Sequence, residues 1–578
     1  MTRLWNEPAA FADEMIDGFV AANRRYVRRV PGGVVRSTLV PESQVAVVIG
    51  GGSGHYPAFG GLVGQGLAHG AAMGNLFASP SAQQVHSVAT AAQHAGGVFF
   101  SYGNYAGDVL NFDAAQVRLR AEGIPCETVR VTDDISSASV EERHKRRGIA
   151  GDLTVFRIAA AAAESGYDLA GVTEVARRAN ERTRSFGVAF TGCTLPGAEA
   201  PLFSVPEGRM AVGLGIHGEP GIDETGVPTA DGLAELLATR LLAELPDDIT
   251  EAHGRRVLPI LNGLGAVKYE ELFVVYRRVA GLLEQAGVEI VDPHVGEYCT
   301  SFDMAGTSLT LFWLDEELER LWGTPVDTPA YRRGSVVAAA QDTTGATIEA
   351  ALGIPAASDA SRAAAALAAR AVEVTAETID AHVDELGRLD QIAGDGDHGI
   401  GMQRGALAAR AAAQAAAGRG AGAGTVLVHA GDAWSDRAGG TSGALWGVIL
   451  RSIGETIGDQ DAPSEASIAA GVAAASRGVI AYGKAEVGDK TMVDALVPFS
   501  AELMLRVDSG ASLTAAWQSA ADAATRAAAR TADLLPRMGR ARPHAEKSLG
   551  TPDPGAHSLA LIATAIGALL ADTSDDRN

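Results

Sequence analysis

The residue pattern changes partway along this chain of 578 residues, and the change limits what it can fold into. From about residue 360, alanine dominates and strand patterns vanish, which predicts an all-helical C-terminal half. Before about residue 335, short apolar runs end in glycine loops and are followed by helical stretches, which predicts an α/β sheet covered by helices. These runs are 45–49, 97–102, 210–216, 257–261 and 309–313.

The two textures also predict the domain organisation, because a chain of this length does not form a single core. We assign residues 1–335 to an α/β domain and residues 363–578 to a helical domain, with residues 336–362 as the linker. Within the helical half, glycine-rich connections are expected at 418–424 and 438–443.

Composition argues against several classes of partner and against export. A net charge of −23 disfavours nucleic acid and anionic membrane, since both require clustered cations. The basic run at 143–147 follows two glutamates and is interpreted as a solvated helix end. The three cysteines lie far apart without a CxxC pair, which fits a reducing compartment and gives no zinc signature. With neither an apolar signal region nor an uninterrupted apolar run of membrane-spanning length, a cytoplasmic protein is expected.

Three loops of the N-terminal half carry polar side chains where apolar runs end. The loop 50–55 reads G-G-G-S-G-H and ends at His55, the loop 103–108 ends at Asp108, and the run 210–216 is predicted to deliver His217. Open α/β sheets bind ligands at the carboxyl ends of their strands. Two histidines and an aspartate there can supply a base, an orienting group and a nucleophile, although the glycines alone could serve a tight turn.

A cluster of aspartates marks the C-terminal half. Asp390, Asp395 and Asp397 fall within eight residues and are followed by His398. Carboxylates packed so closely repel one another unless a hard cation lies among them, and Mg²⁺ is the usual occupant. Such a magnesium cluster most often serves a phosphate group, which points to phosphoryl transfer. An Asp/Gly-rich surface turn is the alternative.

Taken in order, the motifs resemble the dihydroxyacetone kinase family in its single-chain, ATP-using form, over nearly the whole chain. The resemblance implies a substrate domain followed by a nucleotide domain that is a closed barrel of antiparallel helices. It rests on G-G-G-S-G-H at 50–55, G-Q-G-L at 64–67, N-Y-A-G-D at 104–108, R-R-G-I-A-G at 146–151, G-I-H-G-E-P-G-I-D at 215–223, N-G-L-G at 262–265, T-S-F-D-M-A-G-T-S-L-T-L at 300–311 and the aspartate motif from residue 389.

The resemblance implies roles for the N-terminal residues. His217 would attack the ketone of a short keto-sugar and hold it as a covalent hemiaminal. His55 would take the proton from the hydroxyl that receives phosphate, while Asp108 would orient the substrate and share in the acid–base work. The substrate pocket would be lined by Gly52, Ser53, Gly54, His55, Gly103 and Asp108.

It also implies the cofactors ATP and Mg²⁺ in the C-terminal half. Asp390, Asp395 and Asp397 would carry paired Mg²⁺ ions under the phosphates, next to the glycine loop and helix start at 438–447. Gly483 and Met492 would touch the adenine end. The nucleotide pocket would be formed by His398, Gly399, Ile400, Gly401, Thr441, Ser442, Gly483, Met492, Arg540, Asp553, Pro554 and Gly555.

Two departures from the family pattern bear on the substrate. Tyr56 stands where the family usually has an acidic residue, and Gly103 stands where it often has a lysine. Losing the lysine should make room and remove a charged donor, and Tyr56 should add a bulky polar edge. We therefore expect retained chemistry with altered selectivity, for a four-carbon ketose such as erythrulose, with neutral drift at the pocket rim as the alternative.

Other readings of the resemblance stay open. One is a phosphoprotein-dependent relative that keeps ADP as a cofactor, although that form normally divides the two halves between separate chains. A second is a non-catalytic ketose sensor, and a third activity, cyclisation of a flavin nucleotide, would leave no trace in the sequence. Family members often form homodimers in which one chain's nucleotide domain serves the other's substrate domain, so a domain-swapped homodimer is expected.

Overall fold

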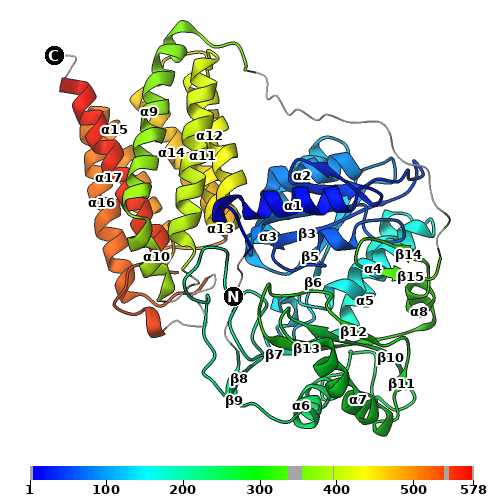
Figure 1. Cartoon of the computed structure of the whole chain (residues 1–578). Helices are drawn as coiled ribbons and strands as arrows, with labels where there is room; N and C mark the ends of the chain where they lie inside the picture. Colours follow the sequence, from blue (N-terminus) through cyan, green and yellow to red (C-terminus); the bar gives the residue numbers. More distant parts are fainter. Residues whose placement is uncertain are drawn as a thin grey trace. The chain divides into compact units, whose positions relative to one another are not determined.

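The computed structural model describes residues 4–219, 221–335, 337, 354–392, 394, 396–538 and 546–575. Contacts divide the chain into two compact units, Met1–Ile348 and Glu349–Asn578 (Figure 1). The first unit contains strands and helices, whereas the described part of the second contains helices only. This division confirms the predicted fold class.

The first unit contains a sheet whose central strands are parallel. Its strand order is β1-β2-β4-β3-β5-β6, in which β4, β3, β5 and β6 run parallel and β2 pairs antiparallel with β1 and β4. Alternate residues of β3 face opposite layers and are fully buried on both faces, which explains the continuous apolar run in the sequence. The strands are β1 (Val27–Val30), β2 (Gly33–Arg36), β3 (Ala46–Ser53), β4 (Gly70–Leu76), β5 (Val98–Gly103) and β6 (Cys126–Val131).

A second sheet, mostly antiparallel, follows along the chain. Its order is β11-β10-β13-β7-β8-β9, and β12 pairs with β10. The strands therefore form two sheets, not the single sheet that the sequence suggested. The sequence could not separate them, because strands of both sheets are buried on both faces and look alike as apolar runs. The strands are β7 (Thr183–Ala189), β8 (Arg209–Val212), β9 (Asp223–Gly226), β10 (Arg256–Gly263), β11 (Glu289–Ile290), β12 (His294–Gly296) and β13 (Gly306–Trp313).

Helices fill the space between the sheets and cover their outer faces. The helix α4 (Asp152–Glu164) is buried along almost its whole length in a core shared with both sheets, and α5 (Leu169–Glu181) packs beside it. The outer face of the first sheet is covered by α2 (Ala82–Ala92) and α3 (Ala106–Ala121), and that of the second by α6 (Ala230–Leu242) and α7 (Tyr269–Gln285). The remaining elements are α1 (Phe11–Ala22), α8 (Glu316–Trp322), β14 (Val326–Asp327) and β15 (Arg332–Arg333).

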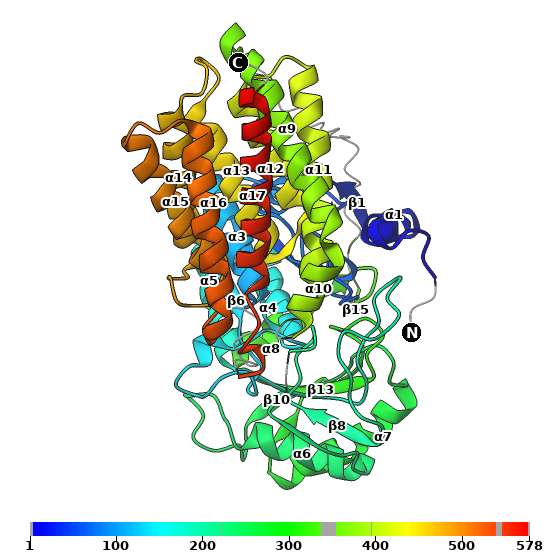
Figure 2. The same ribbon diagram turned by 90° about the vertical axis from the view of Figure 1, so that its left-hand side faces the viewer.

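The second unit is a ring of helices. From α9 through α11 to α17 each long helix packs against the next, and α17 packs back on α9 (Figures 1 and 2). Alanines recur every three or four residues on the buried face of α11, where small side chains let neighbouring helices approach closely. The helices are α9 (Asp359–Ala381), α10 (Val383–Gln391), α11 (His398–Gly418), α12 (Ala423–Ala438), α13 (Gly440–Ile457), α14 (Glu465–Gly483), α15 (Val493–Asp508), α16 (Leu513–Arg530) and α17 (Pro554–Asp575).

The first helix of the ring begins earlier than the sequence suggested. The hydroxyl of Ser358 accepts the backbone N–H of Ser361 at 3.0 Å and caps α9, which starts at Asp359. The last residues of the predicted linker 336–362 are therefore helical, because Ser-Asp-Ala-Ser is an N-cap sequence and not only a polar connection. Of the rest of that linker, residues 336 and 338–353 lie outside the described residues.

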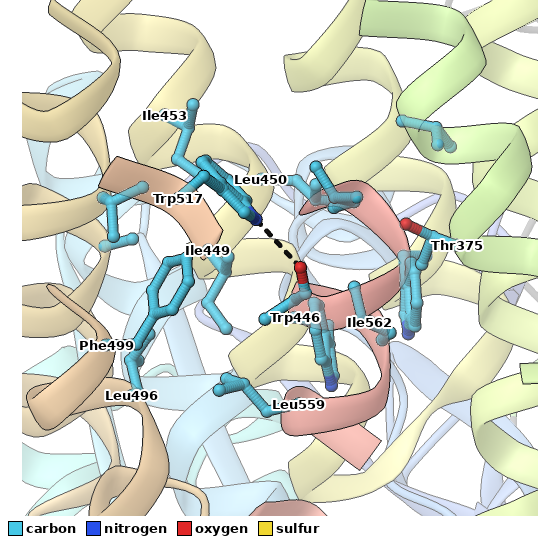
Figure 3. Close-up of a pocket in the computed structure, with 16 residues that line it drawn as sticks. Thr375, Trp446, Ile449, Leu450, Ile453, Leu496, Phe499, Trp517, Leu559 and Ile562 are labelled. Carbon is cyan, nitrogen blue, oxygen red and sulfur yellow. Dashed lines mark hydrogen bonds between the residues drawn. The ribbon is translucent and has the colours of Figure 1, made fainter. Parts of the chain in front are cut away.

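The ring encloses an apolar cavity of about 80 Å³ (Figure 3). The rings of Trp434 and Trp446 stack with centroids 5.0 Å apart, and the indole N–H of Trp517 donates to the carbonyl of Ala563 at 2.9 Å. Apart from Thr375, the other lining residues, such as Ile449 and Phe499, are apolar side chains from several helices of the ring. The packing is thus looser at the centre of the ring than between neighbouring helices.

One described helix is long and apolar enough to cross a membrane by length and composition alone. Residues 554–573 of α17 have a mean hydropathy of 1.5, and 39 % of the window is buried inside the unit. The buried face includes Leu559, Ile562 and Ala563, which belong to the core of the ring. Burial of this face accounts for its apolar character, which His557 and Ser558 interrupt in the sequence.

Candidate active site

His55 lies in the loop that follows β3, at the carboxyl edge of the first sheet. Its backbone carbonyl accepts the N–H of Thr300 at 3.2 Å, and its ring Nδ1 lies 2.7 Å from the carbonyl of Thr300. The preceding residue, Gly54, has a φ of +104°, a conformation that L side chains rarely adopt, and its carbonyl accepts the N–H of Phe302 at 2.8 Å. The segment 300–302 therefore fixes the His55 loop from outside the first sheet.

His217 lies in a loop of the second sheet, several residues beyond its strand. The strand β8 ends at Val212, and the chain turns at Gly213, which has a φ of +74°, before returning as β9. The prediction that a strand delivers His217 directly is therefore wrong, because residues 213–216 form part of the turn. The hydroxyl of Ser301 donates to the carbonyl of Ile216 and holds this loop.

The two histidines meet although they come from different sheets. Their Nε2 atoms are 3.0 Å apart, and both side chains are buried. The ring of Phe77 lies 5.0 Å from that of His55, and the ring of Tyr105 lies edge-on to His217 at 4.5 Å. Burial and the facing His217 lower the pKa of His55 to about 3, so this imidazole is a neutral base at physiological pH.

Asp108 lies in the first turn of α3, three residues after Tyr105, and is buried. Two further buried carboxyl groups, Asp133 and Asp152, lie near this turn. Burial, together with Asp133 and Asp108, raises the pKa of Asp152 well above its usual value, and burial raises the pKa of Asp133 to about 6. Three buried carboxyl groups thus lie near the first turn of α3, and two of them, Asp133 and Asp152, have raised pKa values.

The glycine loop and its flanking positions shape the surroundings of His55. The hydroxyl of Ser53 donates to the carbonyl of Gly74 at 2.6 Å, and a Cβ on Gly52 would lie 2.7 Å from the backbone N of Ala78. The ring of Tyr56 packs against Phe19 of α1, with centroids 6.1 Å apart, and is half exposed. Tyr56, Ser53 and Gly54 all line a small pocket of about 20 Å³ beside α1.

Gly103, the last residue of β5, is buried beside the aromatic ring of Tyr105, which packs edge-on against His217. A Cβ at this position would lie 3.0 Å from Cε2 of Tyr105 and 3.3 Å from the carbonyl of Gly148. Contacts of 3.0 Å are tighter than side chains normally make, so any residue larger than glycine displaces the Tyr105 ring.

Two residues that sequence reasoning did not assign to the site lie directly behind His217. Nδ1 of His217 is 3.0 Å from Oε1 of Glu219, and its backbone N–H donates to Oε2 at 3.0 Å. The guanidinium of Arg147 lies 3.9 Å from Glu219 and bonds Asp134 at 2.7 Å. The only signal in the sequence is the acid two residues after the histidine in H-G-E.

The sequence suggested that the basic run at 143–147 is a solvated helix end, but two of its arginines are largely buried. The side chain of Arg146 is 1 % exposed and pairs with Glu244, and that of Arg147 is 14 % exposed. Their acidic partners Asp134 and Glu244 lie 13 and 98 residues away in the chain, so neighbouring residues could not reveal them.

In the second unit, two of the predicted metal ligands, Asp390 and Asp397, lie where α10 ends and α11 begins. Asp390 is in the last turn of α10, Asp397 is the N-cap of α11, and the backbone N–H of His398 donates to Oδ2 of Asp390 at 3.3 Å. Desolvation by the surrounding protein and the neighbouring Asp390 raise the pKa of Asp397 to about 7. Two carboxylates that repel each other in this way fit a bound divalent cation.

The third predicted ligand, Asp395, lies outside the described residues. Within the described ranges there is no group of three histidine, cysteine or acidic residues that could hold a metal ion. Asp390 and Asp397 therefore supply an oxygen donor pair of the kind that Mg²⁺ prefers, and the role of Asp395 stays a prediction.

The starts of several helices meet at this end of the ring. Nε2 of His398, in the first turn of α11, lies 3.1 Å from the hydroxyl of Ser558 in α17, and its Nδ1 lies 3.4 Å from the hydroxyl of Ser442 in α13. A Cβ on Gly555 would lie 3.4 Å from the Cβ of Met492, which is the N-cap of α15. Helix N-termini present unpaired backbone N–H groups, so this end of the ring suits anionic groups.

The other predicted nucleotide residues lie around the same helix starts. Asp553 accepts the N–H of Ala556 at 2.7 Å, and burial, followed by Asp494 and Asp390, raises its pKa to about 7. A Cβ on Gly399 would lie only 2.1 Å from the carbonyl of Val383, so α11 can pass α10 only with glycine there.

Two of the predicted glycines lie beside helices of the ring, Gly401 beside the end of α12 and Gly483 beside α13. Pro554 is the first residue of α17. The side chains of Ile400 and Thr441 are exposed. The predicted nucleotide ligand Arg540 lies outside the described residues. The structure thus brings together the described members of the predicted set at one end of the helical unit.

Comparison with known proteins assigns a family to each half of the chain. Residues 17–330 match the Dak1 domain, and residues 392–568 match the DAK2 domain. The chain is 61 % identical to the L-erythrulose kinase of Pectobacterium atrosepticum, over 99 % of this chain and 97 % of that kinase, and 54 % identical to the D-erythrulose kinase of Mycolicibacterium smegmatis, over 98 % of each.

A solved structure gives the same family. The crystal structure of the dihydroxyacetone kinase from C. freundii in complex with AMP-PNP and Mg²⁺ aligns with a TM-score of 0.52 and 29 % identity, over 98 % of this chain and 99 % of that one. The chain therefore belongs to the dihydroxyacetone kinase family, with a Dak1 domain and a DAK2 domain joined in one polypeptide.

Proposed function

We propose that this chain is an ATP-dependent kinase that phosphorylates a terminal hydroxyl of a short-chain ketose, with erythrulose as its preferred substrate. The observation that carries the proposal is the buried pair of His55 and His217, whose Nε2 atoms are 3.0 Å apart. Two relatives at 61 % and 54 % identity are named erythrulose kinases, which supports a four-carbon substrate.

The residues of the first unit supply the chemistry of capture and deprotonation. His217 attacks the carbonyl carbon and holds the ketose as a hemiaminal, which selects substrates with a ketone. His55, which stays neutral because its pKa is lowered to about 3, accepts the proton of the hydroxyl that attacks the phosphoryl group. Asp108 orients the substrate at the same edge of the first sheet.

The residues of the second unit hold the nucleotide. Asp390, Asp395 and Asp397 bind Mg²⁺, which, when bound, offsets the charge of the ATP phosphates. The backbone N–H groups at the starts of α11 and α13 and the hydroxyl of Ser442 bind phosphate oxygens. The structure of the C. freundii kinase in complex with AMP-PNP and Mg²⁺ supports ATP and Mg²⁺ as the ligands in general, and the residues that bind them are our proposal.

The substrate is tested with a panel of ketoses and ATP, with ADP release measured by a coupled assay. We expect kcat/KM to be higher for one enantiomer of erythrulose than for dihydroxyacetone, by roughly 10- to 200-fold, because one additional contact contributes only that much discrimination. A higher kcat/KM for dihydroxyacetone than for both erythrulose enantiomers would remove the four-carbon assignment and leave the kinase. Release of ADP with none of the ketoses would overturn the function itself.

Substitution of Gly103 by lysine should reduce activity on erythrulose more than activity on dihydroxyacetone. A side chain at this position displaces the ring of Tyr105, which packs on His217, and brings a cation to the pocket wall. We expect the ratio of the two kcat/KM values to fall roughly 10-fold or more.

The matched control for this variant is Gly18→Lys, on the exposed face of α1, where an added Cβ meets no atom within 4 Å. An equal loss on both ketoses in Gly103→Lys would show that the position supports the fold of the pocket and does not select the substrate.

A further inference from the structure

Lys490 is a buried lysine in the loop that precedes α15, and the proposed function gives it no role. It is only 5 % exposed. Its side-chain nitrogen Nζ donates to the carbonyl of Ser548 at 2.7 Å and to the carbonyl of Leu534 at 3.1 Å. Both acceptors belong to the stretch between α16 and α17, 44 and 58 residues further along the chain. The lysine therefore fastens this stretch to the loop before α15.

The backbone at this position would suit glycine better than lysine. Lys490 has a φ of +59°, in the left-handed region that favours glycine, so the backbone alone does not account for a lysine there. Lys484, the C-cap of α14, has a similar φ of +52°, but its side chain is exposed. The chain thus offers a buried and an exposed lysine in the same backbone conformation, and the two bonds of Lys490 offset the cost of that conformation.

The loop around Lys490 is fixed to the start of α15. The carboxylate of Asp494 accepts the backbone N–H of Gly488 at 2.6 Å and that of Thr491 at 2.8 Å, on either side of Lys490. Met492, which is assigned to the nucleotide, follows as the N-cap of α15. A shift of Lys490 would therefore be passed on to Met492.

The stretch that Lys490 holds is fixed in turn to the start of α17. The carbonyl of Ser548 also accepts the N–H of Thr551 at 3.1 Å, and the N–H of Asp553 donates to the hydroxyl of Thr531 at 2.8 Å. Asp553 then accepts the N–H of Ala556, in the first turn of α17, at 2.7 Å. The position of Ser548 therefore helps to set that of Asp553.

These two fixed segments are the two sides of the nucleotide site in the proposed function. They meet closely, because a Cβ on Gly555 would lie only 3.4 Å from the Cβ of Met492. Building on that site, we propose that Lys490 is a positioning residue for the nucleotide, whose side-chain nitrogen sets the distance between Met492 on one side and the start of α17 on the other.

The charge of Lys490 acts in the same direction as its bonds. Burial raises the pKa of Asp553, and Asp494 and Asp390 add to this rise, whereas Lys490 opposes it. A polyphosphate is repelled by carboxylates unless cations lie among them. A neutral side chain at position 490 should therefore weaken nucleotide binding through both spacing and charge.

The test measures the dissociation constant of AMP-PNP in saturating Mg²⁺, by calorimetry on the full chain without ketose. Lys490→Met keeps nearly the length of the side chain but neither its charge nor its hydrogen bonds. We expect the dissociation constant to rise roughly 10- to 100-fold, the size of a lost charge-assisted hydrogen bond. In the kinase assay the KM for ATP should rise with it, while kcat at saturating ATP and the KM for the ketose change little. A purely structural role would lower the unfolding temperature without moving nucleotide affinity.

The controls separate charge, folding and the proposed function itself. The exposed Lys484→Met should bind AMP-PNP like the wild type. A wild-type dissociation constant in Lys490→Met would overturn the role of Lys490. Should Lys490→Met unfold at a lower temperature than the wild type or fail to fold, Lys490→Gly decides, because glycine suits the left-handed backbone. Added propylammonium should lower its dissociation constant several-fold, and 1-propanol should not.

No response of Lys490→Gly to propylammonium, or an equal response to 1-propanol, would overturn the proposal as well. Failure of the wild type to bind AMP-PNP would instead overturn the nucleotide site of the proposed function.

Discussion

Replacement of Asp397 by asparagine should reduce turnover by roughly 10²- to 10³-fold while leaving ketose binding by the first unit intact. The change removes one of the carboxylates that hold Mg²⁺, so the charge that develops on the transferred phosphoryl group is poorly balanced. The Asp397 side chain makes no capping hydrogen bond to α11, so the helix should still begin at His398 in the variant. The measurement is ADP release at saturating Mg²⁺, beside the binding of labelled ketose by equilibrium dialysis.

The control for this variant is Asp384→Asn, an exposed acid on α10 in the same unit. Its turnover should equal that of the wild type. Near-normal turnover of Asp397→Asn in saturating Mg²⁺ would refute the metal assignment. A loss of ketose binding would mean that the change acts on the fold of the chain and not on the metal alone.

Replacement of His217 by alanine should abolish covalent capture of the ketose. No other nitrogen then takes the place of its Nε2, and His55 loses the partner that lies 3.0 Å away. We expect the tetrahedral ¹³C signal that dihydroxyacetone labelled at its carbonyl carbon gives on capture to disappear and kcat/KM to fall roughly 10²- to 10⁴-fold, the range of positioning and acid–base effects.

Intact-mass or crystallographic detection of a ketose adduct on His217→Ala would contradict this prediction. The exposed His253 is the matched control, because it lies in the same unit beside Gly287, and its replacement by alanine should leave capture unchanged. A variant of His217 that still discriminates ketoses from aldoses would show that selection does not depend on covalent attachment.

The fold class could be predicted from the sequence, because alanine-rich helices and buried apolar strands leave different patterns. The pairing of strands could not. Both β3 and β10 are buried on two faces, so their sequences do not show that one lies in a mostly parallel sheet and the other beside an antiparallel partner. The start of α9 was misplaced because a cap depends on one hydroxyl, Ser358, in a stretch that otherwise looks like a connection.

The sequence identified the site residues that stand in glycine-rich motifs. It did not identify contacts between residues that are far apart in the chain. His55 and His217 could be found from their glycine loops, although nothing in the sequence shows that their rings meet. Arg147 was missed because the acidic residues that precede the basic run in the sequence suggested a solvent-exposed position. Its actual partner, Asp134, can be found only in the structure. Glu219 stands within the motif at 215–223, but only the distance of 3.0 Å to Nδ1 of His217 shows what it contacts.

The segment 300–302 bonds the loops of both histidines, one from each sheet. Thr300 and Phe302 hold the loop of His55, and Ser301 holds the loop of His217. Neither sheet can therefore assemble half of a working site by itself during folding. A nascent chain that has completed only the first sheet carries His55 but has no nucleophile to pair with it. The chain can thus capture a ketose only after the two sheets have packed together. On unfolding, it should lose this ability as soon as the sheets begin to separate.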